Sequence, residues 1–293
     1  KEIADILGFN WTIFPYTKEN WSKWYHSKEW DQLVKFSSNY SSMTHIQDAP
    51  AVTNLVKDAN EKYVFIPGHT GDFISGDHIP FELTVDKEFT ADEVVQSILG
   101  KHHRLWSTSN QDVNREIITE IKHSFSDLPF QDSEQASALF EFWDWKERQA
   151  KFIINSLRTY EYYQQEWEIP LWDDELIDFF LRMPVKYRYK KYLYNLTLHK
   201  MYPDFFDEPT LSIQSGSSLK NKYGPLYGVL RKGYNVKRVF QQYHKDPMEW
   251  YGIYGSYYNY LLNITFTYNG SRFTNPYNIN SFLVKDYIKN LKG

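Results

Sequence analysis

A glycine-rich segment with a single carboxylate, Pro67-Gly-His-Thr-Gly-Asp72, follows directly on the apolar run Tyr63–Ile66. Gly68 and Gly71 allow the backbone to approach a ligand closely and to point its N–H groups at an anion. Asp72 is a suitable ligand for a divalent cation held against that anion. The segment therefore indicates phosphate binding with a metal ion, while a plain structural turn after a strand gives the same pattern.

Two cations on a predicted helix are candidates to face such an anion. The helical pattern from about Ser133 to Tyr163 carries an apolar stripe that passes through Lys146, with Arg148 two residues further on. A lysine on such a stripe either extends to solvent, pairs with a carboxylate, or points into a cleft and binds phosphate. Lys146 and Arg148 are therefore a candidate phosphate-binding pair beside these structural alternatives.

The elements that position these residues alternate between strand and helix. A short continuous apolar run such as Tyr63–Ile66 is typical of a buried parallel strand, and ligands bind beyond the carboxyl ends of such strands. Asn10–Pro15 reads as another strand, and helices are expected near 19–36 and 49–58. This order predicts an α/β protein with a parallel, Rossmann-like sheet flanked by helices. The C-terminal part is expected to be largely helical.

Composition excludes several classes of protein. The 293 residues carry a formal net charge of -4 and no cysteine. Without a basic surface, nucleic acid and anionic membranes are poor partners. Without cysteine there is no disulfide and no Cys-type glutaminase nucleophile, so amide nitrogen would need a separate source. No apolar stretch approaches the roughly 18 residues of a membrane span, and the first residues do not read as a signal peptide, which predicts a cytoplasmic location.

Several separate segments agree in order and spacing with one family. Pro67–Phe73 with Gly76 resembles Ser-Gly-(Glu or Asp)-Gly-x-Asp-Glu, and Glu166–Asp173 resembles Glu-x-Arg-x-Pro-Phe-Leu-Asp. Met183-Pro184 and Lys191 resemble the Leu-Pro and Lys that follow in that family. The chain thus resembles the synthetase domain of asparagine synthetase and its relatives, the ATP pyrophosphatases of the adenine-nucleotide alpha-hydrolase-like superfamily. It also resembles single-domain relatives found among bacterial surface-polysaccharide genes.

The resemblance implies a domain organisation and a reaction. It covers residues 1–203, expected to form the synthetase-like domain, with 204–293 as a helical or mixed extension packed on it. The implied enzyme is an ATP-dependent amide-forming ligase or amidotransferase synthetase. The oxygen of a small-molecule carboxylate attacks the α-phosphorus, pyrophosphate leaves, and ammonia displaces AMP from the acyl-adenylate. Ammonia would be free or come from a separate glutaminase subunit.

The resemblance also implies roles for individual residues. Mg²⁺ on Asp72 and the ammonium of Lys191 would stabilise the departing pyrophosphate. Gly68, Thr70 and Gly71 would contact phosphate. Taken alone, Lys191 also fits a solvated lysine at the start of a helix.

The departures from the family pattern are as informative as the matches. His69 stands where the family has an acid that resembles a general base, and a neutral imidazole, with an ordinary pKa of about 6.5, can take a proton from an amine. Phe73 replaces a Glu, and Glu168 stands where Arg is usual. The nucleotide loop Ser-Gly-Gly-x-Asp-Ser is expected upstream of Lys1, so these residues alone are expected to be inactive. The one similar run, Ser215–Ser218, is interpreted as a turn.

Two alternatives to the ligase therefore remain. One is a degenerate, non-catalytic homologue that serves as a binding or scaffold module, which the three substituted motif positions favour. The other is a different activity on the same fold, such as modification of a sugar acid in polysaccharide assembly. The aromatic content, with 24 Tyr, 20 Phe and 10 Trp, favours this last alternative.

Overall fold

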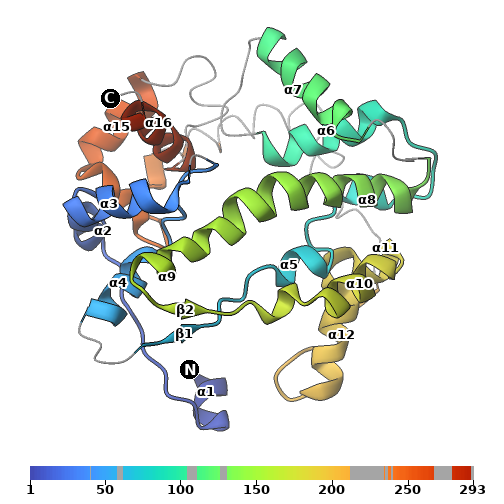
Figure 1. Ribbon diagram of the computed structural model, residues 1–293, viewed down its shortest axis with the longest axis horizontal. Coiled ribbons are helices and arrows are strands. Elements are labelled where there is room, and N and C mark those ends of the chain that lie inside the picture. Colours follow the sequence, from blue (N-terminus) through green and yellow to red (C-terminus); the bar gives the residue numbers. More distant parts are fainter. Residues whose placement is uncertain are drawn as a thin grey trace.

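The computed structural model describes residues 1–39, 41–57, 62–103, 111–125, 131–211, 234, 237–238, 240–266 and 279–291. Over these residues the chain is mostly helical and contains one two-stranded sheet. A long helical rod crosses the molecule (Figure 1). It consists of α8 (Ser133–Asp144), the π-helical η2 (Trp145–Ile153), the 3-10 turn η3 (Ile154–Leu157) and α9 (Arg158–Tyr162). The predicted helix from 133 to about 163 is thus confirmed, with a change of winding in its middle.

The sheet is smaller than the sequence predicts. Strand β1 (Val64–Phe65) pairs in parallel with β2 (Glu166–Trp167), and Val64 lies opposite Glu166. The predicted parallel pairing is therefore present in one pair of strands, but the described residues are α-rich and do not form the predicted Rossmann-like sheet flanked by helices. The predicted strand Asn10–Pro15 is wrong, because this segment is irregular and mostly exposed.

Strand β1 is also not the buried strand that its apolar sequence predicts. Val64 is 52% exposed and Ile66 is 63% exposed, whereas the ring of Phe65 stacks on Tyr160 at 4.4 Å between centroids. Within the described residues, β2 is the one strand that pairs with β1, and the rod covers a single face of the pair. A two-stranded pair covered on one side leaves alternate side chains in solvent.

At the N-terminus the structure divides one predicted helix into two. Helix α2 (Lys18–Tyr25) and helix α3 (Lys28–Ser37) replace the single helix expected near 19–36. The reason is local: the Ser27 hydroxyl accepts a hydrogen bond from the backbone N–H of Trp30 at 3.1 Å, which caps the start of a new helix. The preceding helix α1 (Glu2–Leu7) ends as expected at Gly8, which has a left-handed φ of 69°.

The remaining elements are mostly short helices and turns, grouped around the rod (Figure 1). The sequence predicts the starts and ends of several of them, including the capping box of Thr90 and Glu93 at the start of α6, and the end of α10 before Met183-Pro184. In chain order these elements are α4 (Ala49–Lys57), α5 (Gly71–Ile74), η1 (Phe81–Thr84), α6 (Ala91–His102), α7 (Gln111–His123), η4 (Pro170–Trp172), α10 (Asp174–Arg182), α11 (Val185–Arg188), η5 (Tyr189–Lys191), α12 (Tyr192–Met201), η6 (Trp250–Tyr254), α15 (Tyr257–Phe266) and α16 (Ile279–Leu291).

An aromatic core joins the two ends of the chain. Trp21 of α2 and Tyr260 of α15 are fully buried in one cluster, together with residues of α3, η6 and α16. The Trp21 indole N–H donates to the Met248 carbonyl at 2.8 Å. The described residues beyond 204 are largely helical, as predicted, and they pack on α2 and α3 beside the rod (Figure 1).

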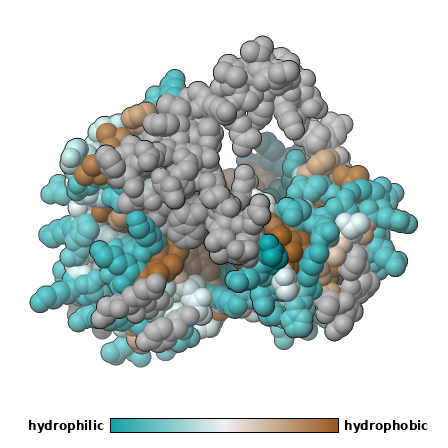
Figure 2. Space-filling model, turned by 90° about the horizontal axis from the view of Figure 1, so that it is seen from above, coloured by the Kyte–Doolittle hydropathy of each residue, from teal (hydrophilic) through white to brown (hydrophobic). Residues whose placement is uncertain are grey.

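The surface is mainly polar. The face shown in Figure 2 is hydrophilic over most of its described part, and hydrophobic side chains show in small groups between the hydrophilic ones. Among the described helices, none has both the length and the apolar character needed to cross a bilayer.

Candidate functional site

One pocket of about 380 Å³ collects most of the residues that the sequence singles out for phosphate, metal and proton chemistry. Its wall is formed by the loop after β1, the π-helical part of the rod, η4 and the start of α12. The predicted residues that line it are Gly68, His69, Thr70, Gly71, Asp72, Arg148 and Lys191. The structure thus brings together three segments that are far apart in the sequence.

The glycines of the loop have different surroundings. A Cβ on Gly71 would lie 3.0 Å from the Leu171 side chain, so Gly71 allows close packing on η4. A Cβ on Gly76, which has φ of 85°, would lie 2.7 Å from the Arg188 carbonyl oxygen. At Gly68 a Cβ would meet no atom within 4 Å. Packing and a positive φ therefore demand Gly76, a side chain at Gly71 would need Leu171 to shift slightly, and the space beside Gly68 is open to a ligand.

Lys191 forms the central ion pair of the pocket. Its ammonium donates to Asp72 Oδ1 at 2.9 Å and lies 3.8 Å from Asp77 Oδ2. The hydrogen bond to Asp72 raises the pKa of Lys191, and partial burial opposes this shift. Lys190 and Lys191 both have positive φ, 55° and 59°, in the turn that leads into α12. This strained turn holds a permanent cation against the one carboxylate of the loop.

Two polar atoms of the loop are buried without a hydrogen-bond partner in the described residues. They are Nδ1 of His69 and Oγ1 of Thr70, and Thr70 has a left-handed φ of 98°. Burial lowers the pKa of His69, although the nearby carboxylate of Asp48 opposes the shift. His69 is therefore neutral near pH 7. Both atoms are available to a ligand that enters the pocket.

A second imidazole in the pocket is absent from the sequence-based prediction. His78 lines the pocket, and its Nδ1 lies 2.5 Å from Oδ2 of Asp144, which is fully buried on α8. His102 approaches the other carboxylate oxygen at 3.7 Å. Burial raises the pKa of Asp144, but the hydrogen bond and charge of His78 and the charges of His102 and Arg148 outweigh this, and the net pKa is lowered.

The ionised Asp144 favours one tautomer of His78. When the proton of that contact is on Nδ1, Nε2 is the ring nitrogen left for other partners, which is how a carboxylate orients an imidazole for proton transfer. Two signals in the sequence were available to find this pair. His78 lies two residues after Gly76 of the loop motif, and Asp144 is a carboxylate on the apolar stripe of the long helix.

Lys146 is the one predicted site residue that the structure places elsewhere. Its side chain is exposed and lines a different pocket, with His103 and Glu120, on another side of the rod from Arg148. Lys146 and Arg148 both lie in the π-helical part of the rod, where two residues span roughly half a turn, so side chains of this spacing point in nearly opposite directions. The prediction that Lys146 and Arg148 face the same cleft is therefore wrong.

The pocket carries few ligands for a metal ion. Among the described residues no group of three or more His, Asp and Glu side chains could hold one. Asp72 is exposed and is the one carboxylate that lines the pocket. A metal ion here would need the oxygen atoms of a bound phosphate to complete its coordination.

Comparison of the chain with protein-family models, with curated proteins and with solved structures finds no match. A lysine, an arginine, two imidazoles and an open glycine loop line the pocket, which are groups of the kind that bind anions and accept protons.

Proposed function

We propose that this chain carries the pyrophosphate-binding part of the active site of an ATP-dependent, amide-forming ligase. The ligase would be of the asparagine synthetase type and would act through an acyl-adenylate. The ion pair between Lys191 and Asp72 carries the proposal, because it joins segments 119 residues apart at the mouth of a glycine-rich loop. The parallel pair of β1 and β2 supports a synthetase-like, Rossmann-like sheet, since the loop follows the carboxyl end of β1.

The residues present fit a phosphate group with Mg²⁺. The space beside Gly68 is open, the Thr70 hydroxyl is buried without a partner in the described residues, and the Asp72 carboxylate is exposed. Mg²⁺ is commonly held by one or two carboxylates and by substrate phosphates, so a single aspartate is sufficient. When bound, the ion would neutralise the charge that develops on pyrophosphate as it leaves.

The chain's own residues would act as follows. Lys191 exchanges its contact with Asp72 for one with the pyrophosphate oxygens, and Arg148 supplies a second positive charge. The Thr70 hydroxyl donates to a phosphate oxygen. His69 or the oriented His78 takes a proton from the incoming amine, since the amine must lose a proton to form an amide.

The substrates, the source of nitrogen and the cellular location are also part of the proposal. The substrates are ATP and a small-molecule carboxylate, and nitrogen comes from ammonia or from a separate glutaminase subunit. The composition favours neither nucleic acid nor membrane as a partner and is compatible with a cytoplasmic enzyme, for example in the biosynthesis of bacterial surface polysaccharides.

One observation favours a non-catalytic binding or scaffold module instead. Phe73, which stands in place of a carboxylate of the family motif, is buried against Ile74 and Phe180, and its ring stacks on Trp172 at 6.2 Å. This position has become part of the hydrophobic core. A protein that needs only to bind a ligand has no use for the second acid.

Calorimetric titration with Mg²⁺ and inorganic pyrophosphate tests the proposal. The wild-type chain should bind, and Lys191→Met should weaken binding by about 10- to 150-fold, the effect of losing a hydrogen bond to a charged group. Lys190→Met is the matched control, because Lys190 does not line the pocket. Asp72→Ala should remove the dependence of binding on Mg²⁺. Absence of binding, or equal losses in Lys190→Met and Lys191→Met, would favour the scaffold alternative.

A further inference from the structure

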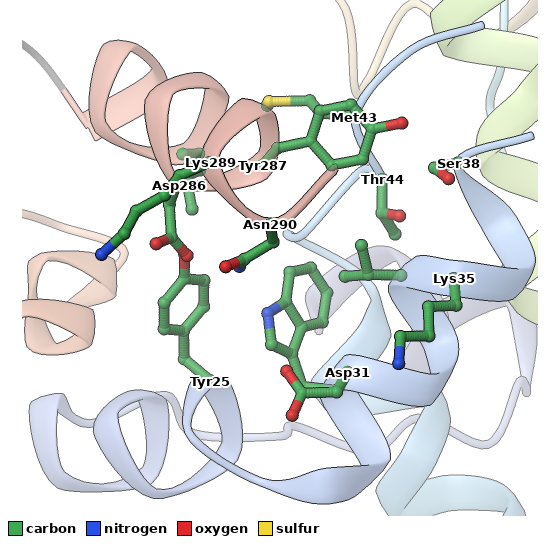
Figure 3. A pocket seen from close by; sticks show the side chains of 13 residues that line it. Tyr25, Asp31, Lys35, Ser38, Met43, Thr44, Asp286, Tyr287, Lys289 and Asn290 are labelled. Atoms are coloured by element: carbon green, nitrogen blue, oxygen red, sulfur yellow. The ribbon is translucent and has the colours of Figure 1, made fainter. Parts of the chain in front are cut away.

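A second and larger cavity lies between α3 and α16. Its volume is about 520 Å³, and it shares no lining residue with the Gly68–Asp72 pocket. Tyr25, Trp30 and Leu283 form its buried inner surface. Side chains from α3, from the segment that follows it and from α16 surround the opening (Figure 3). The size lies within the range of roughly 300–1,000 Å³ that is usual for small-molecule sites.

Two carboxylates that line this cavity influence the Tyr25 phenol. Figure 3 shows the Tyr25 ring directed at Asp286, and its hydroxyl donates to Asp286 Oδ2 at 2.6 Å. Asp31, on α3, also lines the cavity. Burial, the hydrogen bond to Asp286 and the charges of Asp286 and Asp31 all raise the pKa of the Tyr25 phenol. The phenol therefore stays neutral and donates its proton to the hydrogen bond with Asp286.

These negative charges have no ion-pair partner in the part of the chain that the structure describes. Lys35 and Lys289 also line the cavity, but both side chains are exposed. In Figure 3 the Lys289 side chain extends outward past Asp286. Water screens exposed charges strongly, those of Lys35, Lys289 and Asp31 alike, so the half-buried Asp286 is the charge that acts most strongly on the cavity.

The aromatic walls define the rest of the ligand. Tyr25, Trp30 and Tyr287 contribute rings to the cavity, and an organic cation is attracted to the face of such rings. The Tyr287 hydroxyl is buried without a hydrogen-bond partner in the described residues and can accept a ligand N–H. We propose that this cavity is a binding site for a small organic ammonium ion that carries an aromatic ring. This site is independent of the chemistry proposed for the Gly68–Asp72 pocket.

Three probes that share a phenylethyl group and differ in charge test the site. Phenethylammonium, 2-phenylethanol and 3-phenylpropanoate are titrated into the isotope-labelled chain, and binding is followed by the indole N–H resonance of Trp30. The ammonium should bind about tenfold more tightly than the alcohol, because it adds a charge-assisted hydrogen bond, and the carboxylate should bind least. Only perturbation of the Trp30 signal reports binding in this cavity.

Substitution of the two carboxylates tests whether they cause the preference for the ammonium probe over the alcohol. Asp286→Asn should reduce ammonium binding to about the level of the alcohol, a loss of about tenfold. Asp31→Asn, at an exposed position, gives a second test that does not disturb the contact with Tyr25. Asp178→Asn is the control, because Asp178 is exposed on α10 and pairs with Arg182. Equal affinity for ammonium and alcohol, unchanged binding in Asp286→Asn, or an equal loss in the control would overturn the proposal.

Discussion

The buried ion pair between Arg188 and Glu141 holds α11 against the long rod. Both side chains are almost fully buried, and Arg188 Nη1 donates to Glu141 Oε1 at 2.5 Å. Arg188 Nε also donates to the Met183 carbonyl at 2.9 Å. Because the backbone of Arg188 lies directly against Gly76, the same pair supports the turn that follows Asp72. Substitution of Arg188 should therefore destabilise the fold and the pocket loop together.

Arg188→Met keeps the apolar stem but leaves the Glu141 carboxylate buried without its cation. Breaking a buried pair in this way costs about 3–5 kcal/mol of the free energy of unfolding. Burial raises the pKa of Glu141, and Arg188 opposes that shift. The pKa should rise further in the variant, so its folded state binds a proton that the unfolded state does not. The loss of stability should then be greatest near about pH 7.5 and smaller near about pH 5.

Urea unfolding followed by circular dichroism at both pH values measures this loss. The double variant Glu141→Leu/Arg188→Met should recover about 3–5 kcal/mol relative to Arg188→Met, because no uncompensated buried charge remains. Arg182→Met is the control, since its exposed pair with Asp178 is worth less than about 1 kcal/mol. A cost below about 1 kcal/mol for Arg188→Met, or a double variant no more stable than the single one, would refute the reasoning.

Three further predictions concern other contacts. Gly252→Ala should lower stability by about 1–3 kcal/mol in thermal unfolding, because the new Cβ would lie 2.2 Å from a backbone oxygen of α2; an unchanged melting temperature would contradict this. Tyr25→Phe should cost about 1.5–3 kcal/mol in urea unfolding, since it removes the hydrogen bond to Asp286, and a cost near zero would count against that bond. Asp144→Asn should reduce the Nδ1–H tautomer of His78 in ¹⁵N spectra, and an unaltered tautomer would show that Asp144 does not orient the ring.

The sequence alone was sufficient for features that depend on a few neighbouring residues. The end of α1 at Gly8, the capping box of Thr90 and Glu93, and the end of α10 before Met183-Pro184 are all confirmed. Each depends on the backbone geometry or the hydrogen bonds of a single turn, which the residues of that turn decide. It was also predictable that the residues Gly68–Asp72 would line one pocket, because they are consecutive in the sequence.

Only the tertiary structure decided which side chains meet across long separations. The apolar sequence of β1 does not show that, within the described residues, the strand pairs with β2 alone and leaves Val64 exposed, because burial depends on what packs against it. His78 and Asp144 are 66 residues apart, and nothing local to either residue specifies their contact. Lys146 and Arg148 are close in sequence yet face different pockets, since the packing of the rod selects which side of it faces the loop.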